Sequence, residues 1–265
     1  MQRRSILVTG ASSGIGFLCA EHLAATGCRV LAASRRGLAP PGCEPLVMDV
    51  DDDGSVERAV GTAGRVDAVV LCAGWGIAGA IEDTSAAEAK AQFETNFFGA
   101  HRVVRAVLPA MRARGAGHVV LVSSLAAAVP LPYQALYSAS KAALSSYAEA
   151  LRLELVPSGV QVSCIEPGNF RTGFTGSRRR AAGWTPASAH AAGAEASLRW
   201  MEQDELRAPP PEAVVRRIVA VLEQPRPALR HVVVAHAFER VGAWLRVLLP
   251  RRVYEKIAVK VFRVL

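Results

Sequence analysis

Short apolar runs alternate with longer amphipathic stretches along most of this 265-residue chain. The apolar runs are rich in Val, Ile, Leu and Ala, which is typical of strands that are buried on both faces of a sheet. We expect strands at residues 5–9, 28–34, 45–48, 67–72, 118–123, 160–165 and 230–234. Apolar positions at helical spacing predict helices at residues 17–25, 55–61, 85–114 (in two parts) and 212–223, and one that carries Tyr137 and ends near residue 156.

This alternation of strands and helices predicts an α/β fold, in which a doubly wound parallel sheet of about seven strands has helices on both faces. The length suits one large domain that spans residues 1–265 and buries roughly 70–75% of the surface of its unfolded chain. Hydrophobic residues make up 51% of the chain, as a sheet covered on both faces requires. We therefore expect a single domain, followed by a C-terminal helical extension.

The C-terminal extension, residues 238–265, is basic and amphipathic. Val253, Ile257 and Val261 follow one another at steps of four residues with Arg and Lys between them, and Pro250 divides the segment into two helices. Three interpretations remain open here. The segment packs against the domain or a partner subunit, lines the mouth of a binding site, or makes peripheral contact with anionic lipid.

Charge and cysteine usage exclude several classes of protein. The formal net charge is +8, but much of it lies at residues 178–180 and in the last 26 residues, without a basic face interleaved with aromatic residues, so we expect no nucleic-acid binding. The five scattered cysteines favour reduced thiols and offer no metal site. The first strand follows Met1 almost at once, without the apolar region of a signal peptide or a membrane span, so we expect a soluble, cytoplasmic protein.

A glycine-rich turn follows the first strand and leads into the first helix. A strand, a glycine turn and a helix N-terminus form an anion site, because unpaired backbone N–H groups and the helix dipole face the ligand. The spacing is T-G-x-x-x-G-x-G, a wider loop than G-x-G-x-x-G. We expect this turn to hold the pyrophosphate of a dinucleotide through Gly10, Ser12, Ser13, Gly14, Ile15 and Gly16.

The end of the second strand bears on the choice between NAD and NADP. An NAD site usually has Asp or Glu here to accept a hydrogen bond from the ribose 2′-hydroxyl, whereas this chain has Ser34, Arg35 and Arg36. Guanidinium groups suit a 2′-phosphate, so we expect NADP to be preferred, with NAD still possible. The alternative is that both arginines are solvated loop charges.

Tyr137 and Lys141 stand four residues apart, one helical turn, and therefore on one face of their helix. A fixed cation favours the phenolate, so we expect Lys141 to lower the pKa of Tyr137 and make it a general acid. Ser124 lies thirteen residues before Tyr137 at the end of a strand, and this spacing favours it over Ser123 as a third member of the site.

Together, these ordered motifs resemble the short-chain dehydrogenase/reductase family, whose fold is of the Rossmann type, over nearly the whole chain. The resemblance implies a catalytic set of Asn96, Ser124, Tyr137 and Lys141. It also implies cofactor contacts from Asp49 and Val50, from Cys72, Ala73 and Gly74, from Asn96, Tyr137 and Lys141, and from Pro167, Gly168, Phe170 and Thr172. Cys72 departs from the family pattern, which has Asn there, and a neutral thiol can pack as a small hydrophobic group. Residues 165–174 further resemble the branch with retinol and 17β-hydroxysteroid dehydrogenases.

The resemblance implies an NADP(H)-dependent carbonyl reductase or alcohol dehydrogenase that acts on a small molecule. In the family, Asn96 would kink its helix and position a water beside Lys141, and residues 173–211 would form a mobile lid, although an ordinary pair of surface helices is the alternative. The substrate is expected to be lipophilic because apolar and aromatic residues face it: Trp75, Tyr133, Gln134, Phe170 and Phe174.

Homo-oligomers are common in the family. The competing functions are a non-catalytic NADP-binding regulatory protein on the same fold, and an epimerase or dehydratase that uses the cofactor transiently.

Overall fold

A computed structural model describes residues 3–264, apart from the side chains of Ala237, Phe238, Arg240, Ala243, Trp244 and Val247. Its centre is a seven-stranded sheet in the order β3-β2-β1-β4-β6-β7-β9, and every neighbouring pair is parallel. The strands are β1 (Ser5–Thr9), β2 (Arg29–Ser34), β3 (Glu44–Val47), β4 (Ala68–Leu71), β6 (Gly117–Val122), β7 (Val160–Pro167) and β9 (Arg230–Val233). The predicted doubly wound parallel sheet of seven strands is therefore confirmed.

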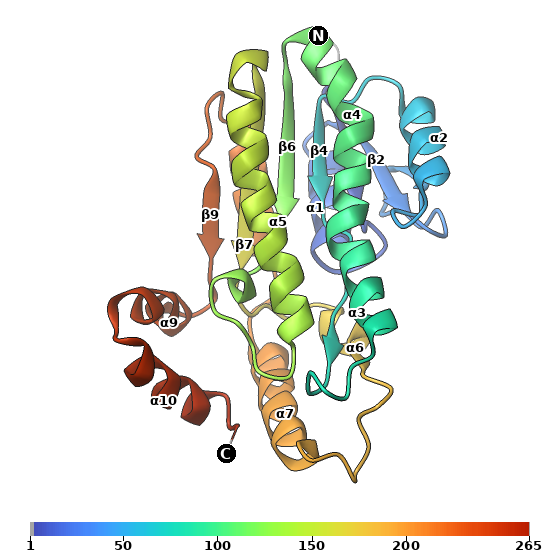
Figure 1. Cartoon of the computed structure of the whole chain (residues 1–265). Helices are drawn as coiled ribbons and strands as arrows, with labels where there is room; N and C mark the ends of the chain where they lie inside the picture. The colour runs from blue at the N-terminus through green and yellow to red at the C-terminus, as the bar shows by residue number, and fades with distance from the viewer. Residues whose placement is uncertain (1–2, 265) are drawn as a thin grey trace.

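Helices cover both faces of the sheet (Figure 1). One apolar cluster joins the sheet to α2 (Asp53–Ala63), α4 (Ala100–Arg114) and α5 (Ala135–Glu154), with Val56, Val104 and Leu144 at its centre. A second cluster joins the other face to α1 (Gly14–Ala25) and α8 (Glu212–Glu223), through residues such as Leu23 and Ile218. The central strands are therefore covered on both faces, which explains their near-continuous apolar runs, whereas the edge strand β3 has three exposed residues of four.

The order of the strands places a crevice at one edge of the sheet. The chain runs outward from β1 to β2 and β3, then returns to β4 on the other side of β1. Loops after β1 and β4 therefore leave the sheet in opposite directions, and ligands bind at this switch point in open α/β sheets.

The helix expected at residues 85–114 is interrupted where it passes this edge. It consists of α3 (Ala86–Phe93), a π-helical turn (Glu94–Gly99) and α4. The capping box between Ser85 and Glu88 fixes its start. Short π-helical turns occur mostly at functional sites, because they displace side chains from regular helical spacing. The expected division of this helix, with a distortion at Asn96, is confirmed.

Residues 173–211 contain more structure than their weak pattern predicts. They form α6 (Phe174–Ser177), β8 (Arg179–Arg180) and α7 (Ala191–Arg207), and β8 pairs with β5 (Ile77–Ala78) in a small parallel sheet. Strands of two residues have no detectable periodicity, so this sheet was not predicted.

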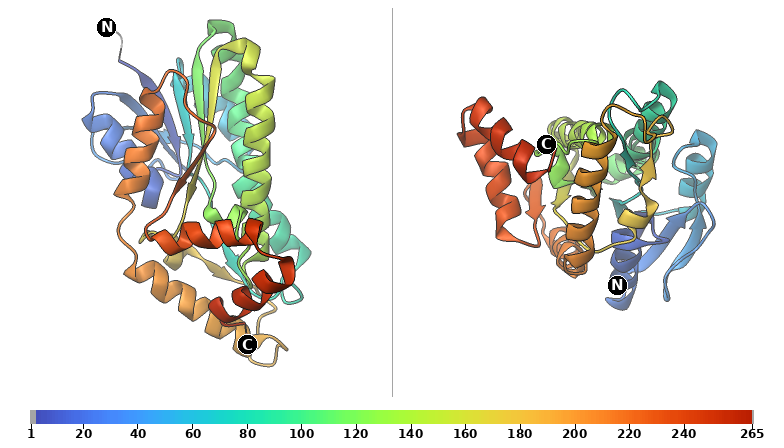
Figure 2. Two further views of the ribbon diagram at one scale, coloured as in Figure 1. Left: turned by 90° about the vertical axis from the view of Figure 1, so that its left-hand side faces the viewer. Right: turned by 90° about the horizontal axis from the view of Figure 1, so that it is seen from below.

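The C-terminal segment forms the two expected helices, α9 (Ala237–Leu248) and α10 (Arg251–Val261), which Pro250 separates. Figure 1 shows both at the same end of the molecule as α7, beyond the carboxyl ends of the strands. Seen from that end, they lie beside β9 and far from α1 and β2 (Figure 2). No helix within residues 3–264 combines the length and the apolar character needed to cross a bilayer.

Candidate active site

The glycine turn between β1 and α1 has the close backbone packing of a phosphate-binding loop. Gly10 has φ +66°, and a Cβ built on it would lie 2.8 Å from the backbone nitrogen of Ala73. A Cβ on Gly16 would lie 2.4 Å from the carbonyl oxygen of Gly10. Thr9 Oγ1 accepts hydrogen bonds from the N–H groups of Cys72 and Ala73, both at 3.2 Å, and so holds the ends of β1 and β4 together. Only glycine suits both positions, and the turn leaves the start of α1 open to an anion.

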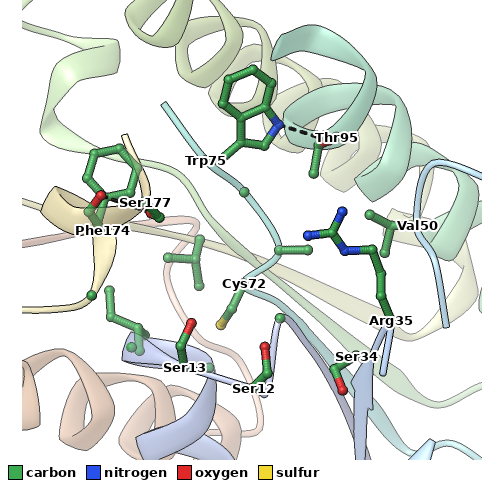
Figure 3. A pocket seen from close by; sticks show the side chains of 18 of the residues that line it. Ser12, Ser13, Ser34, Arg35, Val50, Cys72, Trp75, Thr95, Phe174 and Ser177 are labelled. Atoms are coloured by element: carbon green, nitrogen blue, oxygen red, sulfur yellow. Dashed lines mark hydrogen bonds between the residues drawn. The ribbon is translucent and has the colours of Figure 1, made fainter. Parts of the chain in front are cut away.

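A cavity of about 460 Å³ lies above this turn, at the carboxyl ends of the strands (Figure 3). Most of the residues predicted for cofactor binding line it: Gly10, Ser12, Ser13, Gly14, Ile15, Gly16, Ser34, Arg35, Asp49, Val50, Cys72, Ala73, Gly74, Tyr137, Lys141 and Thr172. These residues come from six separate segments of the chain, which the parallel sheet brings to one edge.

Several predicted residues do not line the cavity. Phe170 is 7% exposed and packs in the core against α8, so its prediction as a substrate or cofactor contact is not supported by its position. The N–H of Gly168 is bonded to Val233 O, and the Glu239 carboxylate covers this glycine. Pro167 is the last residue of β7, and Arg36 is exposed outside the cavity.

Arg35 and Arg36 differ in their positions although they are adjacent in sequence. Arg35 lines the cavity beside Val50, and its guanidinium projects between that residue and the strand that carries Cys72 (Figure 3). Within residues 3–264, it forms neither a hydrogen bond nor an ion pair with another side chain. Ser34, just before it, is 7% exposed and donates a hydrogen bond to Leu38 O. Arg35 therefore offers free donors to an anionic group at the end of β2.

The substitution at Cys72 leaves a neutral group at the cavity wall. Burial raises the pKa of this thiol to about 12, against a smaller opposing effect of the Lys141 cation. The thiol therefore stays protonated near neutral pH, which agrees with its interpretation as a small packing residue.

Tyr137 and Lys141 line one end of the cavity, and Ser124 contacts Tyr137 there, but neither Ser124 nor the predicted Asn96 is among the lining residues. The Tyr137 hydroxyl is hydrogen-bonded to the side chain of Ser124, and Lys141 Nζ lies 6.0 Å from the centre of the Tyr137 ring. The Ser123 hydroxyl forms a different hydrogen bond, since it donates to Lys141 O at 2.9 Å. Ser123 lines the cavity and Ser124 contacts Tyr137, so the choice of Ser124 by its thirteen-residue spacing stays a prediction.

The expected effect of Lys141 on the tyrosine was wrong for the structure as it stands. Burial raises the pKa of Tyr137, and the nearby carboxylate of Glu205 raises it further, while the Ser124 hydrogen bond and the Arg178 cation lower it. Lys141 is not among the causes of this shift. Its Nζ donates to Val122 O at 3.0 Å, and burial lowers its own pKa to about 8. Desolvation thus outweighs the attraction between phenolate and ammonium.

Asn96 lies behind this group and is 1% exposed. Its amide spans the peptide of Trp75, since Oδ1 accepts from Trp75 N and Nδ2 donates to Trp75 O, each at 3.0 Å, and Nδ2 also donates to Ser140 Oγ. A Cβ on Gly74 would be 3.2 Å from Asn96 Oδ1 and 3.5 Å from Lys141 Nζ. The π-helical turn therefore brings the amide next to the lysine, across the glycine.

The segment 173–211 packs directly over the tyrosine. The rings of Phe174 and Tyr137 are 5.1 Å apart, and the guanidinium of Arg178 lies 5.3 Å from the Phe174 ring. Arg178 is 2% exposed and forms a buried ion pair with Glu205, whose carboxylate also accepts from Thr175 Oγ1 at 2.6 Å. This pair ties α6 to α7 and holds Phe174 in place.

Some cavity residues carried no signal in the sequence. Thr95, on the π-helical turn, accepts from Trp75 Nε1 at 3.1 Å and donates to Asp51 at 2.9 Å (Figure 3). The guanidinium of Arg179 lies 4.3 Å from the Trp75 ring. Trp75 and Phe174 were predicted to face the substrate and both line the cavity. Tyr133 and Gln134, also predicted, do not line it.

Comparison with known proteins identifies residues 4–183 as matching the short chain dehydrogenase family. A 3-ketodihydrosphingosine reductase of Bacteroides thetaiotaomicron is 36% identical over 253 residues, which are 92% of this chain and 94% of that protein. The human 17-beta-hydroxysteroid dehydrogenase type 1 is 37% identical over 193 residues, which are 66% of this chain and 59% of that protein. The expected relation to the hydroxysteroid dehydrogenase branch is thereby confirmed.

Solved structures agree with this assignment. A short-chain dehydrogenase from Streptomyces avermitilis has a TM-score of 0.83 and 31% identity, with 98% of each chain covered. A short chain dehydrogenase from Burkholderia cenocepacia in complex with NADP has a TM-score of 0.74 and 25% identity, with 96% of this chain and 97% of that chain covered.

Proposed function

The chain belongs to the short-chain dehydrogenase family of oxidoreductases, and on that premise we propose that it transfers hydride between NADP(H) and a carbonyl or alcohol of a lipophilic substrate. One observation supports this most strongly. The Tyr137 hydroxyl, bonded to Ser124 and beside Lys141, faces the same cavity as the glycine turn. A proton donor and a dinucleotide site therefore share one space.

The residues of the cavity fit a nicotinamide dinucleotide. Gly10 and Gly16 leave no room for side chains, so the backbone can approach a pyrophosphate at the start of α1. The unpaired guanidinium of Arg35 suits a 2′-phosphate, and no carboxylate follows β2 to favour the 2′-hydroxyl of NAD. When bound, the nicotinamide supplies or accepts the hydride.

Each side chain of the catalytic set has a distinct task in reduction. Ser124 donates a hydrogen bond to the substrate oxygen and orients it, and Tyr137 donates the proton that this oxygen acquires. Lys141, whose pKa is lowered to about 8 by burial, still carries its proton on most molecules at neutral pH and stabilises negative charge that develops nearby. Asn96 holds the peptide of Trp75 and the π-helical turn next to this lysine.

The raised pKa of Tyr137 keeps the phenol in the protonated form that reduction of a carbonyl uses. A phenol with a raised pKa stays protonated across neutral pH, and it remains far more acidic than the alcohol that forms, so it still gives up its proton. Oxidation of an alcohol requires the phenolate instead, which this burial disfavours.

The proposed substrate class rests on the walls of the cavity and on one relative. Trp75 and Phe174 present aromatic surface to the cavity, and Phe174 lies beside Tyr137. The Bacteroides relative is by name a reductase of a long-chain sphingoid ketone. A long-chain ketone, with a steroid or retinoid as related possibilities, is the class of substrate that these residues support, and a cytoplasmic enzyme is the setting we propose.

The test is consumption of NADPH with a panel of long-chain, steroid and short-chain ketones. Tyr137→Phe should keep its NADPH affinity and lose about 10²- to 10⁴-fold in kcat, the typical contribution of a general acid. Tyr147→Phe is the matched control, because Tyr147 lies on the same helix outside the cavity and its hydroxyl is hydrogen-bonded to His101. NADPH binding without turnover on any ketone would favour the non-catalytic regulatory protein, and Tyr137→Phe activity within about tenfold of the parent would remove the assigned role.

A further inference from the structure

α10 presents an apolar stripe to solvent. Val253, Ile257 and Val261 are 44%, 38% and 47% exposed, and their spacing of four residues places them on one face of the helix. Isolated exposed apolar residues are common on protein surfaces, but three in line on one short helix form a continuous strip.

Cations flank this strip and lack partners. Arg252, Lys256, Lys260 and Arg263 are exposed, and none of them forms an ion pair or hydrogen bond with a side chain that the structure describes. Between residues 238 and 265, seven Arg or Lys face two Glu, so this segment carries +5 of the net charge of +8. Arg251 is paired with Glu255. The cations of α10 that have no such partner therefore lie mainly beside the apolar strip.

The remaining contacts hold α10 on the domain from its other side. Phe262, which is 8% exposed, packs edge-on against Trp200 of α7 with ring centres 5.8 Å apart. Arg246 of α9 donates to Ala128 O, in the loop that follows Ser124. The two helices therefore bridge α7 and the Ser124 loop, at the end of the molecule where the cavity lies (Figures 1 and 2).

From this arrangement we propose that α10 docks flat on the surface of an anionic lipid bilayer, with its apolar strip inserted among the lipid chains and its cations on the headgroups. Charge decides between lipid and a second copy of the chain. A symmetric contact through the same strip would bring identical cations together across the interface, which is unfavourable, whereas anionic headgroups complement them. α7, which contacts α10 through Trp200 and Phe262, would then lie on the side of α10 away from the membrane.

The experiment is co-sedimentation of the full chain with vesicles of phosphatidylcholine, with or without phosphatidylglycerol. We expect binding only when phosphatidylglycerol is present, and release by high salt, because screening weakens the headgroup contacts. Lys256→Gln/Lys260→Gln should lower the partition coefficient about 30-fold, from roughly fivefold per lysine. Ile257→Ser/Val261→Ser should lower it roughly tenfold, since both side chains are already exposed and the fold does not need them.

Arg216→Gln/Arg217→Gln is the matched control, because it removes two exposed charges from α8 on another part of the molecule. It should bind like the parent. Equal losses in the control and in the lysine variant, or no binding to anionic vesicles at low salt, would overturn the proposal. Dissociation of an oligomer by the Ile257→Ser/Val261→Ser variant, without any vesicle binding by the parent, would assign the strip to a subunit interface instead. The assay reads binding rather than turnover, so its outcome is independent of the proposed redox activity.

Discussion

Removal of the Arg35 side chain tests the basis of the proposed NADP preference. Charge-assisted hydrogen bonds contribute about 1.5–3 kcal/mol each. Arg35 is exposed, so solvent weakens its contact and the lower end of this range applies, about 1.5 kcal/mol, or roughly 12-fold in Kd. Arg35→Ala should therefore raise the Kd of NADPH roughly 12-fold. NADH has only a hydroxyl at this position, and its Kd should change by less than about threefold.

Titration calorimetry of the parent, Arg35→Ala and Arg36→Ala with both cofactors provides the measurement. Arg36 is the matched control, since it has the same charge and adjacent position but lies outside the cavity. The difference between NADPH and NADH should shrink as salt rises, because the contact is partly screened. If Arg35→Ala lost equal affinity for NADPH and NADH, the residue would support the turn rather than the 2′-phosphate. If Arg36→Ala weakened NADPH binding as much as Arg35→Ala, the charge would act at long range.

Three further outcomes follow from contacts around the cavity. In a titration, Gly16→Ala should weaken NADPH binding more than about tenfold, because its Cβ would collide with backbone 2.4 Å away. Gly61 lies in open space on α2, so Gly61→Ala should instead add up to about 1 kcal/mol to the free energy of unfolding. Arg178→Met and Glu205→Gln should each lower the free energy of unfolding in urea by about 3–5 kcal/mol, and the double variant should recover most of this loss. Simple additivity of the two single losses would contradict a coupled pair. The pKa of Lys141 is lowered to about 8 in the folded state, so the unfolded chain binds this proton more tightly. The Tm of the cofactor-free parent should therefore rise, relative to that of Lys141→Met, as the pH goes from about 8 to about 10.4.

The positions of the strands and helices of the main sheet could be predicted because their signals are local. The strand at residues 5–9 and the helix at residues 212–223 have the predicted bounds, since buried apolar runs and a Pro-Pro-Pro start leave few alternatives. α1 starts at Gly14, three residues before the expected start: Gly14 itself has φ +56°, and Gly16 packs so closely on Gly10 O that the glycines form the first turn of the helix instead of a loop before it. The pairing of β5 with β8 could not be predicted, because it depends on contacts between segments about a hundred residues apart.

The candidate site likewise has some features that the sequence predicts and others that it does not. The glycine turn and the Tyr137–Lys141 pair depend on short spacings, so the sequence indicated them directly. Phe170 and Thr172 are two residues apart after β7, yet only Thr172 lines the cavity and Phe170 enters the core. Which of two neighbouring side chains points inward depends on how the loop leaves the sheet, and composition does not contain that information.

The acidity of Tyr137 shows most clearly why site chemistry cannot be deduced from spacing alone. The lysine one turn away suggested a lowered pKa, but the dominant influence is burial under Phe174, which lies 37 residues further along the chain. Phe174 can lie there because Gly76 has no side chain, since a Cβ at Gly76 would be 2.7 Å from the Phe174 ring. A segment that covers the tyrosine therefore also sets its proton affinity. Phe174 keeps water away from the phenol and so contributes to its raised pKa, which favours the protonated acid that the proposed carbonyl reduction requires.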